Sequence, residues 1–522
     1  MAVADSKNAI TQAVGFYANT LGKHIMGLSP NIRETVAKWN KESLEQGSLT
    51  SSLEKNEELK DLLLNETPWV GKANEESEQK RNLAGFFDEH LMSTRINSQL
   101  TMLRSLQNGD GSWSWFEGMM GSPYITAEVA ELFVRLNKLA GKQEATSDML
   151  NAAMGFLGNE LIKEVEYIKK YKLHNSMPSE MAMQILYTFA LDGREQEDSV
   201  RKAADYLVSL FEKKSPKLTI FGKARSAVIL SYFGRITTAT KYLESVEQYS
   251  VVTEEMGRYY DTRKAQYSWR SYNIPTEVAA IEAFKMLKPA EVNIVDEMRK
   301  WLLQQKRTQM WDTPINSADA VYAFLHGHEE SLDNGVNSTI TIDGEEVKTS
   351  EATAGLGYVK AAMSAEGKNT LKVDKTSTGT SWGAVYAQYM QEATAVDNLS
   401  SGIKVTREIR SDKKELHVGD KVKVRITVKT ERDYDFVEVI DRRAACMEPV
   451  SQLSGYHFGY YIAPKDYTTT YYFHKMPKGT YVIEAEYYID RAGTYDTGTC
   501  KVQCAYAPEY SATGKALTIE VK

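Results

Sequence analysis

The sequence predicts a multidomain protein in which a closed ring of helical hairpins, an α/α toroid, is followed by a small β domain and a β-sandwich. Apolar residues recur at three- and four-residue spacing from about residue 8 to residue 327, which is typical of helices. From about residue 337 onward apolar and polar residues alternate, as half-buried strands require. Turn-forming clusters at 332–335 and 396–402 separate these regions, so we expect units at 1–330, 331–400 and 401–522.

The composition is that of an ordinary globular chain with more than one core. Its 522 residues are 42% hydrophobic, and its net charge of -7 comes from interspersed charges of both signs. No basic stripe for nucleic acid and no polybasic segment for an anionic membrane is present in the sequence. It has no apolar run of membrane-spanning length and no secretory signal pattern at its start. We therefore expect no direct membrane insertion, and we interpret the chain as a mature or excised C-terminal piece of a longer protein.

The helical half contains a loose repeat of roughly 40 to 55 residues, a period that is typical of stacked helical pairs. In each repeat a short polar lead-in opens a helix rich in small residues, and these openings begin at Pro123, Met177, Phe221, Ile274 and Pro314. Alanine and large apolar residues follow each opening, as expected for a helix packed on both sides. This repeat predicts an inner ring of helices closed into a toroid.

Three glutamates, Glu128, Glu180 and Glu277, lie near the starts of these helices. In a toroid they would converge at one mouth, where two of them would act as the acid and base of a glycan-acting enzyme. Alternatively, each carboxylate lies in a first helical turn, near free backbone amides and the positive end of the helix dipole. We favour the second interpretation and predict no catalytic residue.

Residues 107–113 form a glycine-rich turn that ends in Trp113. The turn resembles the Gln-Trp repeat element of terpenoid-cyclase toroids, in which the Gln and Trp tie neighbouring helices together. No Asp-rich acid motif follows in the helical half, and no cysteine is present there for zinc ligation of the prenyltransferase type. An enzyme acting on isoprenoids is therefore not expected.

His326 and His328, with Glu329 and Glu330, contain the ligand types of a metal site. Two histidines one residue apart on a flexible glycine reach a common ion only with help from outside the motif. A protonated histidine near a helix C-terminus also complements the helix dipole. We interpret the segment as a solvated helix end, and we expect neither a metal nor a cofactor.

The three cysteines, Cys446, Cys500 and Cys504, all lie in the last predicted unit. On one extended strand Cys500 and Cys504 would be about 13 Å apart, too far to bridge each other. A disulfide from Cys446 to Cys504 or to Cys500 remains open and would suit an oxidising compartment, while three buried thiols are the alternative.

Several stretches resemble the C-terminal half of bacterial alpha-2-macroglobulin-like proteins, over nearly the whole chain. They are residues 16–21, 65–69, 106–116 and 309–314 in the helical half, and 380–386, 432–437, 441–449, 477–480 and 505–510 in the β half. Each stretch is weak alone, whereas all of them in this order are specific. The resemblance implies a thioester-type α/α toroid of terpenoid-cyclase-like hairpins, a small β domain and a macroglobulin-like β-sandwich, in a protein of the periplasm or cell envelope.

In thioester-bearing members of that family, a Cys-x-Glu-Gln motif near the start of the toroid joins the Cys thiol to the Gln side chain. The resulting acyl group captures nucleophiles. The matching stretch here is residues 8–12, where the Cys position falls on Asn8 or Ala9 and the Glu is missing. The segment Ser43-Leu-Glu-Gln46 has the spacing of the motif with Ser in place of Cys, but it lies outside the matching context, so we treat it as a coincidence. The resemblance therefore implies that the thioester is absent.

These features imply a non-enzymatic macroglobulin-like protein that inhibits endopeptidases by non-covalent entrapment or docking, with its bait region upstream. An envelope scaffold or binding protein without inhibitor activity is the alternative, and a toroid enzyme acting on glycans or isoprenoids is a third hypothesis. The expected partners are proteases or envelope proteins. Tyrosine-rich stretches at 456–461 and 471–473 are either a recognition surface or residues of the sandwich core and of loop packing, and we favour the second interpretation.

Overall fold

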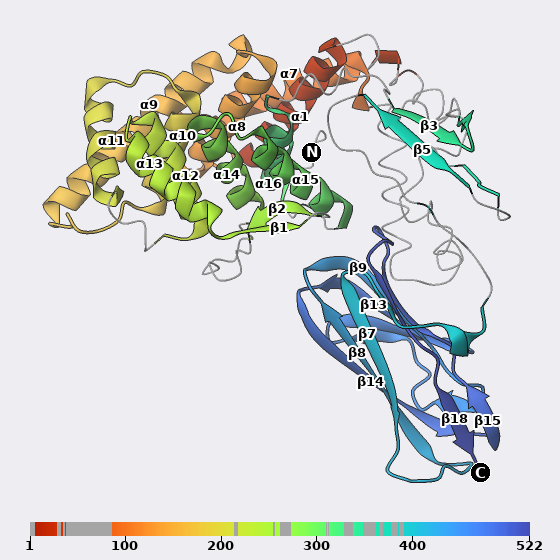
Figure 1. Ribbon diagram of the computed structural model, residues 1–522. Coiled ribbons are helices and arrows are strands. Elements are labelled where there is room, and N and C mark those ends of the chain that lie inside the picture. Colours follow the sequence, from red (N-terminus) through yellow and green to blue (C-terminus); the bar gives the residue numbers. More distant parts are fainter. Residues whose placement is uncertain are drawn as a thin grey trace. The chain divides into compact units, whose positions relative to one another are not determined.

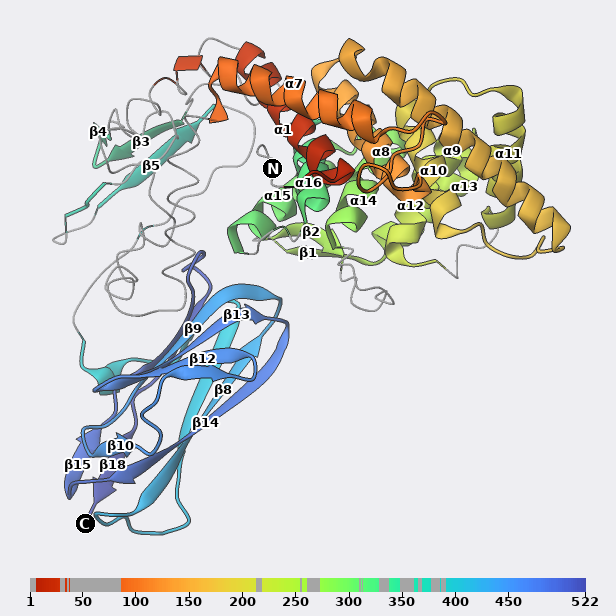
Figure 2. The same cartoon turned by 180° about the vertical axis from the view of Figure 1, so that it is seen from behind.

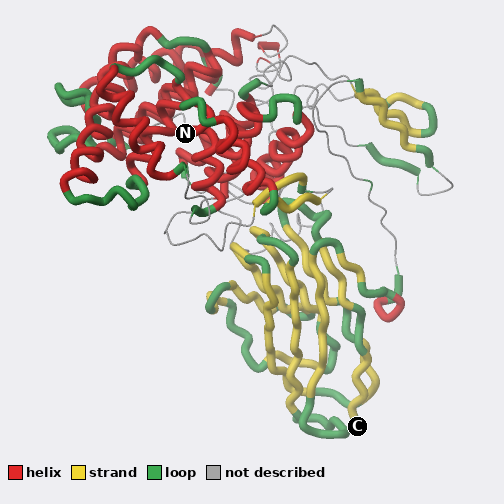
Figure 3. The backbone as a smooth tube through the Cα atoms, turned by 60° about the vertical axis from the view of Figure 1, so that its left-hand side comes forward, coloured by secondary structure: helices red, strands yellow, loops and turns green. Residues whose placement is uncertain are grey.

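The computed structural model describes residues 6–28, 86–212, 218–253, 256–260, 273–308, 313–327, 338–347, 369–376 and 391–522, with a few short fragments between them. The chain divides into two compact units (Figure 1). The first contains the described α-helices and five short strands, and the main part of the second is Ser381–Lys522. Figure 3 shows the change from helix to strand along the chain. The three-unit division at 1–330, 331–400 and 401–522 stays a prediction.

Six helices form the inner ring of the first unit. Each contacts the next inner helix in chain order, and the last contacts the first, so that the ring closes (Figures 1 and 2). They are α1 (Ala9–Leu28), α8 (Pro123–Ala140), α10 (Glu180–Asp192), α12 (Ile220–Tyr232), α14 (Asn273–Leu287) and α16 (Pro314–Leu325). Five of them are the helices that the sequence repeat predicted. The predicted toroid is confirmed.

The inner helices are buried nearly all round, because neighbours pack on both sides. Nine consecutive residues of α12, 222–230, are buried, and so are residues 276–284 of α14. The helices between them in the chain instead bury one face, as α11 does. These are α7 (Glu89–Leu106), α9 (Glu144–Lys170), α11 (Asp198–Phe211), α13 (Ile236–Glu247) and α15 (Val292–Thr308). Inner and outer helices therefore alternate along the chain.

The inner helices begin with similar caps. The side chains of Ser122, Ser179, Thr219 and Thr313 each accept a hydrogen bond from a backbone N–H in the first turn of the helix that follows, at 3.0 to 3.4 Å. The connections after α8, α10, α12 and α14 are short, three to five residues, so each of these inner helices runs antiparallel to the outer helix that follows it. The inner helices therefore start at one end of the ring, which we call the ring mouth.

Two small sheets accompany the helices. Strands β1 (Ser250–Thr253) and β2 (Gly257–Tyr260) form a hairpin between α13 and α14. Within the predicted small β domain, an antiparallel sheet has the order β4-β3-β5. Its strands are β3 (Ser338–Ile342), β4 (Glu345–Glu346) and β5 (Leu371–Lys375). Asp343 and Gly344 both have positive φ, 54° and 88°, as a two-residue hairpin turn of type I′ requires.

The second unit contains two antiparallel sheets and a two-stranded ribbon. The sheet orders are β10-β14-β8-β7 and β11-β12-β13-β9-β16-β17-β6, and the ribbon pairs β15 with β18. The strands are β6 (Leu399–Ser400), β7 (Ile403–Arg410), β8 (Lys421–Thr430), β9 (Tyr434–Arg442), β10 (Met447–Pro449), β11 (Gly455–His457), β12 (Tyr460–Pro464), β13 (Thr468–Met476), β14 (Gly479–Ile489), β15 (Gly493–Asp496), β16 (Cys500–Cys504), β17 (Ser511–Gly514) and β18 (Thr518–Val521). Apolar residues of both sheets form one core.

The alternating segments of the sequence are strands in the structure. Residues 421–428 lie in β8, where every second residue from Val422 to Val428 is buried. Residues 480–487 lie in β14, which pairs with β8 along its length. The predicted sandwich is confirmed. In the part of the chain that the structure describes, no helix has the length and apolar character needed to cross a lipid bilayer.

Candidate functional site

The start of α1 is the segment that matches the family thioester motif. Asn8 caps the helix, because its Oδ1 accepts a hydrogen bond from the Thr11 backbone N–H at 2.8 Å. Its Nδ2 donates to the Ser6 Oγ at 2.9 Å. Ala9 is fully buried, and its backbone N–H donates to the carbonyl of Trp115 at 3.1 Å. The two positions where the family cysteine would fall thus hold a capping amide and a buried methyl group.

Gln12 is the residue nearest to the Gln of the motif. Its Nε2 donates to the backbone carbonyl of Ser6 at 2.9 Å, and the residue is 7% exposed. No thiol lies in residues 6–12, and both amide side chains are occupied by backbone or hydroxyl partners. This segment offers no acyl-transfer chemistry of its own. The segment Ser43–Gln46, which has the motif's spacing with Ser in place of Cys, lies outside the described residues.

The glycine-rich turn ties three helices together, as the Gln-Trp interpretation predicted. Gln107 Nε2 donates to the carbonyl of Met149 in α9 at 2.9 Å. Trp113 is fully buried, and its indole N–H donates to the carbonyl of Leu103 in α7 at 2.9 Å. The backbone N–H of Trp113 donates to the Thr126 hydroxyl in α8 at 2.8 Å. The structural role of this element is confirmed.

The end of this turn exposes apolar side chains beside the start of α1. Trp115, Phe116, Met119 and Met120 are 42%, 48%, 50% and 91% exposed. The carbonyl of Trp115 accepts a hydrogen bond from the Ala9 N–H, and this bond attaches the end of the turn to α1. We call these four residues the 115–120 patch. Exposed apolar residues that adjoin one another are a common feature of interaction surfaces.

The three glutamates do not converge. Glu180 lies in the first turn of α10, is exposed, and pairs with Arg225 at 2.6 Å. Glu128 and Glu277 lie beyond the first turns of their helices and are buried. The first-turn interpretation is therefore confirmed for Glu180 and wrong for the other two.

Glu128 and Glu277 also have different surroundings. Glu128 Oε1 accepts a hydrogen bond from Gln184 at 3.0 Å, and its charged neighbours are Glu131, Asp319 and Arg135. Burial raises the pKa of Glu277 well above its usual value, and the charge that opposes this shift is Arg258. The three residues thus lack the shared setting that an acid/base pair needs.

His326 caps the C-terminal end of α16. Its Nδ1 lies 2.6 Å from Lys285 Nζ and 3.2 Å from the Tyr322 hydroxyl, and its ring stacks on Tyr322. His328, Glu329 and Glu330 lie outside the described residues. Among the residues that the structure does describe, no group of three His, Cys, Asp or Glu side chains is arranged to hold a metal ion.

All three cysteines are free and buried in this structure. Strand register explains this. Cys504 pairs with Val437 near the start of β9, whereas Cys446 follows the far end of β9 and leads into the other sheet. Cys504 Sγ instead contacts the carbonyl of Asp435 at 3.2 Å. Burial raises the pKa of the Cys504 thiol to about 12 and that of Cys446 and Cys500 as well.

The tyrosine-rich stretches divide between core and surface. Tyr471, Tyr472 and Phe473 are buried, as predicted. Tyr456 is 79% exposed and Phe458 is fully exposed, both on the hairpin of β11 and β12, so these two are not core residues.

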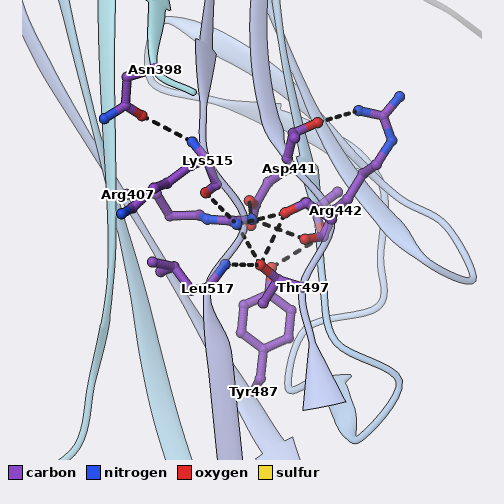
Figure 4. Close-up of polar contacts among 11 residues, drawn as sticks. Asn398, Arg407, Asp441, Arg442, Tyr487, Thr497, Lys515 and Leu517 are labelled. Carbon is purple, nitrogen blue, oxygen red and sulfur yellow. Dashed lines mark hydrogen bonds and ion pairs between the residues drawn. The ribbon is translucent and has the colours of Figure 1, made fainter. Parts of the chain in front are cut away.

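A buried arginine joins the two sheets of the second unit (Figure 4). Arg407 of β7 donates through Nη1 to Asp441 Oδ1 of β9 at 2.7 Å, and both side chains are 2% exposed. Its Nη2 donates to Thr497 Oγ1 at 2.5 Å and to the carbonyls of Gly498 and Lys515 at 2.6 and 3.2 Å. Thr497 Oγ1 also accepts from the Leu517 N–H at 2.9 Å. We call this group the Arg407 network.

The sequence contains a signal for this network, an arginine at an inward position of a strand, which the prediction of strands from alternation does not consider. Ile403, Val405, Arg407 and Ile409 occupy the inward positions of β7, so the arginine interrupts an apolar face. An inward arginine needs a buried anion, because an unpaired buried charge is costly. Burial raises the pKa of Asp441, while Arg407 opposes that shift.

A family model described as the bacterial alpha-2-macroglobulin MG10 domain matches residues 398–509. A curated relative, an alpha-2-macroglobulin homolog from Nostoc sp., is 21% identical over 334 residues, which are 62% of this chain and 17% of the relative. The chain thus spans less than a fifth of that relative's length.

Solved structures of bacterial alpha-2-macroglobulins are also similar. Trypsin-activated alpha-2-macroglobulin from Escherichia coli is 13% identical with a TM-score of 0.43, and the match covers 83% of this chain and 30% of that chain. Native Escherichia coli alpha-2-macroglobulin from domain MG7 to the C-terminus is 14% identical with a TM-score of 0.32. The match covers 93% of this chain and 75% of that chain.

The family-model match shows that residues 398–509, most of the sandwich of the second unit, are similar to the MG10 domain of bacterial alpha-2-macroglobulins. Together with the curated relative, it confirms that this chain resembles the C-terminal portion of the bacterial alpha-2-macroglobulin-like family.

Proposed function

We propose that this chain is part of a macroglobulin-like protein of the periplasm or cell envelope, which inhibits endopeptidases by non-covalent entrapment or docking and has no catalytic activity. The observation that carries the proposal is the MG10 match over residues 398–509. The chain spans 17% of the curated relative, so we place the bait region in a longer protein, upstream of this portion.

The non-covalent part of the proposal is supported by the start of α1. An amide side chain is a weak nucleophile, and Asn8 is engaged in capping, while Ala9 carries no reactive group. The chain has three cysteines, all in the second unit and all buried. Because the thiolate is the reactive form, buried thiols with raised pKa values are inert near neutral pH.

The experiment mixes the full-length protein, including the upstream portion in which we place the bait region, with a panel of endoproteases. It follows cleavage of a large protein substrate beside a small peptide substrate. Entrapment predicts selective loss of cleavage of the large substrate, with no covalent adduct on denaturing gels. Docking over the protease active site predicts loss of both activities, again without an adduct.

Two controls sharpen the result. Heat-unfolded protein should leave both substrates cleaved, because inhibition needs the folded domains. Treatment of the folded protein with iodoacetamide should leave inhibition unchanged, because no thiol takes part. A covalent adduct would contradict the non-covalent mechanism, and normal cleavage of both substrates across the panel would favour an envelope scaffold without inhibitor activity.

A further inference from the structure

Side chains from all six inner helices meet inside the ring. Arg135 of α8 is ion-paired with Asp319 of α16 and, at 2.7 Å, with Glu131 of its own helix. The Arg135 side chain is 3% exposed, and its guanidinium lies over the ring of Tyr322. The remaining members are Glu128, Tyr17 of α1, Gln184 and Tyr187 of α10, Arg225 of α12, and Glu282 of α14. We call this set the ring-centre cluster.

The cluster contains more acidic than basic groups. Its carboxyls are Glu128, Glu131, Glu282 and Asp319, and its cations are Arg135 and Arg225. At its edge Glu282 also faces His326, whose Nδ1 lies 3.9 Å from Glu282 Oε1 and 2.6 Å from Lys285 Nζ. Four carboxylates and two guanidinium groups would give a net charge of -2 if all were ionised. Arg225 also pairs with the exposed Glu180 at 2.6 Å, which leaves even less positive charge for the interior. An uncompensated charge buried in a helical core is strongly unfavourable.

Arg135 cannot neutralise both of its partners. Asp319 and Glu131 share its single positive charge, and Glu128 lies one helical turn from Glu131 on the same face of α8. Burial, reinforced by the neighbouring Glu131, raises the pKa of Glu128 to about 8. Burial also raises the pKa of Glu131 to about 7, although Arg135 opposes that shift.

A second observation points to a proton in this cluster. The Tyr187 hydroxyl is buried without a hydrogen-bond partner among the described residues, and the residue is 4% exposed. Its electrostatic neighbours are Arg135, Glu282, Glu131 and Asp319, so it faces the cluster. Because a neutral phenol adds no positive charge, it does not offset the excess of carboxyls around it, and a proton on one of them would do so.

We propose that the ring-centre cluster binds a proton at neutral pH, on Glu128 or Glu131, and that release of this proton at alkaline pH loosens the ring. The step is the ionisation of one carboxylic acid to a carboxylate and a proton that passes to solvent. It leaves a further negative charge among groups contributed by every inner helix. The stability of the toroid would then depend on the pH of its surroundings.

The sign of the effect follows from linkage. A carboxyl whose pKa is higher in the folded state holds its proton there after the unfolded chain has released it. The stability that this proton contributes is fully present below the unfolded value of 4.5 and is lost as pH rises to about 8, the folded value for Glu128. For one proton the unfolding equilibrium constant should rise up to about tenfold per pH unit in this window.

The test uses infrared spectra and thermal unfolding of the protein between pH 5 and pH 9. We expect the carbonyl band of a protonated carboxylic acid at pH 6 and its loss above pH 8. The unfolding midpoint of the helical signal should fall between pH 5 and about pH 8 and level off above that value. Glu131→Gln, which is neutral at every pH, should reduce both the band change and the fall. Glu166→Gln, at an exposed position of α9, should behave as the unsubstituted protein does.

Two outcomes would overturn the proposal. One is a folded protein whose spectrum at pH 6 contains no protonated carboxyl band. The other is an equal pH dependence of the midpoint in the unsubstituted protein, in Glu131→Gln and in Glu128→Gln. If one of the two variants fails to fold, the other decides the question in the same infrared comparison, because a band from Glu277, whose pKa burial also raises, is common to every variant.

Discussion

Replacing Arg407 with methionine should destabilise the sandwich strongly while leaving the helical ring unchanged. The variant removes the cation and leaves Asp441 with its carboxyl 2% exposed between the sheets. It also removes the donor to Thr497 and to the carbonyls of Gly498 and Lys515. Breaking a buried ion pair by removing one partner typically costs about 3–5 kcal/mol, because the remaining charge has no compensation. Against a typical domain stability of about 5–15 kcal/mol, this is a large fraction.

The assay is urea unfolding followed by two signals. Hydrogen exchange of peptides from β7 and β9 reports on the sandwich, because tyrosines occur in both units and their signal does not separate them. The far-ultraviolet helical signal reports on the ring. We expect Arg407→Met to lower the midpoint of the first transition only. The matched control is Arg425→Met on β8, whose partly exposed side chain lies 3.8 Å from Glu484 and should matter by less than about 1 kcal/mol.

A double variant separates the loss of the pair from the loss of packing. Replacing Asp441 with leucine as well removes the stranded carboxyl, so Arg407→Met with Asp441→Leu should be more stable than Arg407→Met alone. The reasoning would be refuted if Arg407→Met and Arg425→Met had the same midpoint. It would also fail if the loss of stability in the double variant, relative to the unsubstituted protein, equalled the sum of the losses in the two single variants.

Two further predictions concern residues that the sequence singled out. Asn8→Ala should cost about 1 kcal/mol in the helical transition, because it removes the cap that accepts from Thr11, whereas Asn8→Ser should retain most of the stability; equal losses for both would contradict the capping role. The three cysteines should resist alkylation in the native protein at pH 7.5 and react fully on unfolding, and mass spectrometry without reductant should find three free thiols. A Cys446–Cys504 linkage in that measurement would contradict the register of β16.

The ring was predictable because its evidence repeats along the chain. Each inner helix carries a polar opening and small residues, and the same pattern five times over outweighs any single ambiguity. Ring closure is different, because it depends on contacts between α1 and α16, some 300 residues apart in sequence. The repeat as a whole predicted closure, and the family resemblance implied the same toroid, but neither identified the pair of helices that meets.

The placement of the glutamates could not be predicted because it depends on where each helix begins. Glu180 directly follows its cap Ser179, whereas Glu128 lies six residues after its cap Ser122. An error of a few residues in a helix start moves a side chain from the ring mouth to the ring interior. The spacing of Glu128, Glu131 and Arg135, three and four residues apart, was the signal for a shared polar face inside the ring.

The chemistry available in this chain limits what a macroglobulin-like function can be here. Acyl capture needs a thiolate or an activated ester, and residues 6–12 supply neither. The three thiols are buried in the second unit with raised pKa values, so they cannot stand in for the missing group. What the ring mouth does offer is contact area, because the 115–120 patch is anchored to α1 through Trp115 and exposes two methionines. Methionine adapts its shape to varied apolar partners, so a surface of this kind suits binding that depends on contact rather than on bond formation.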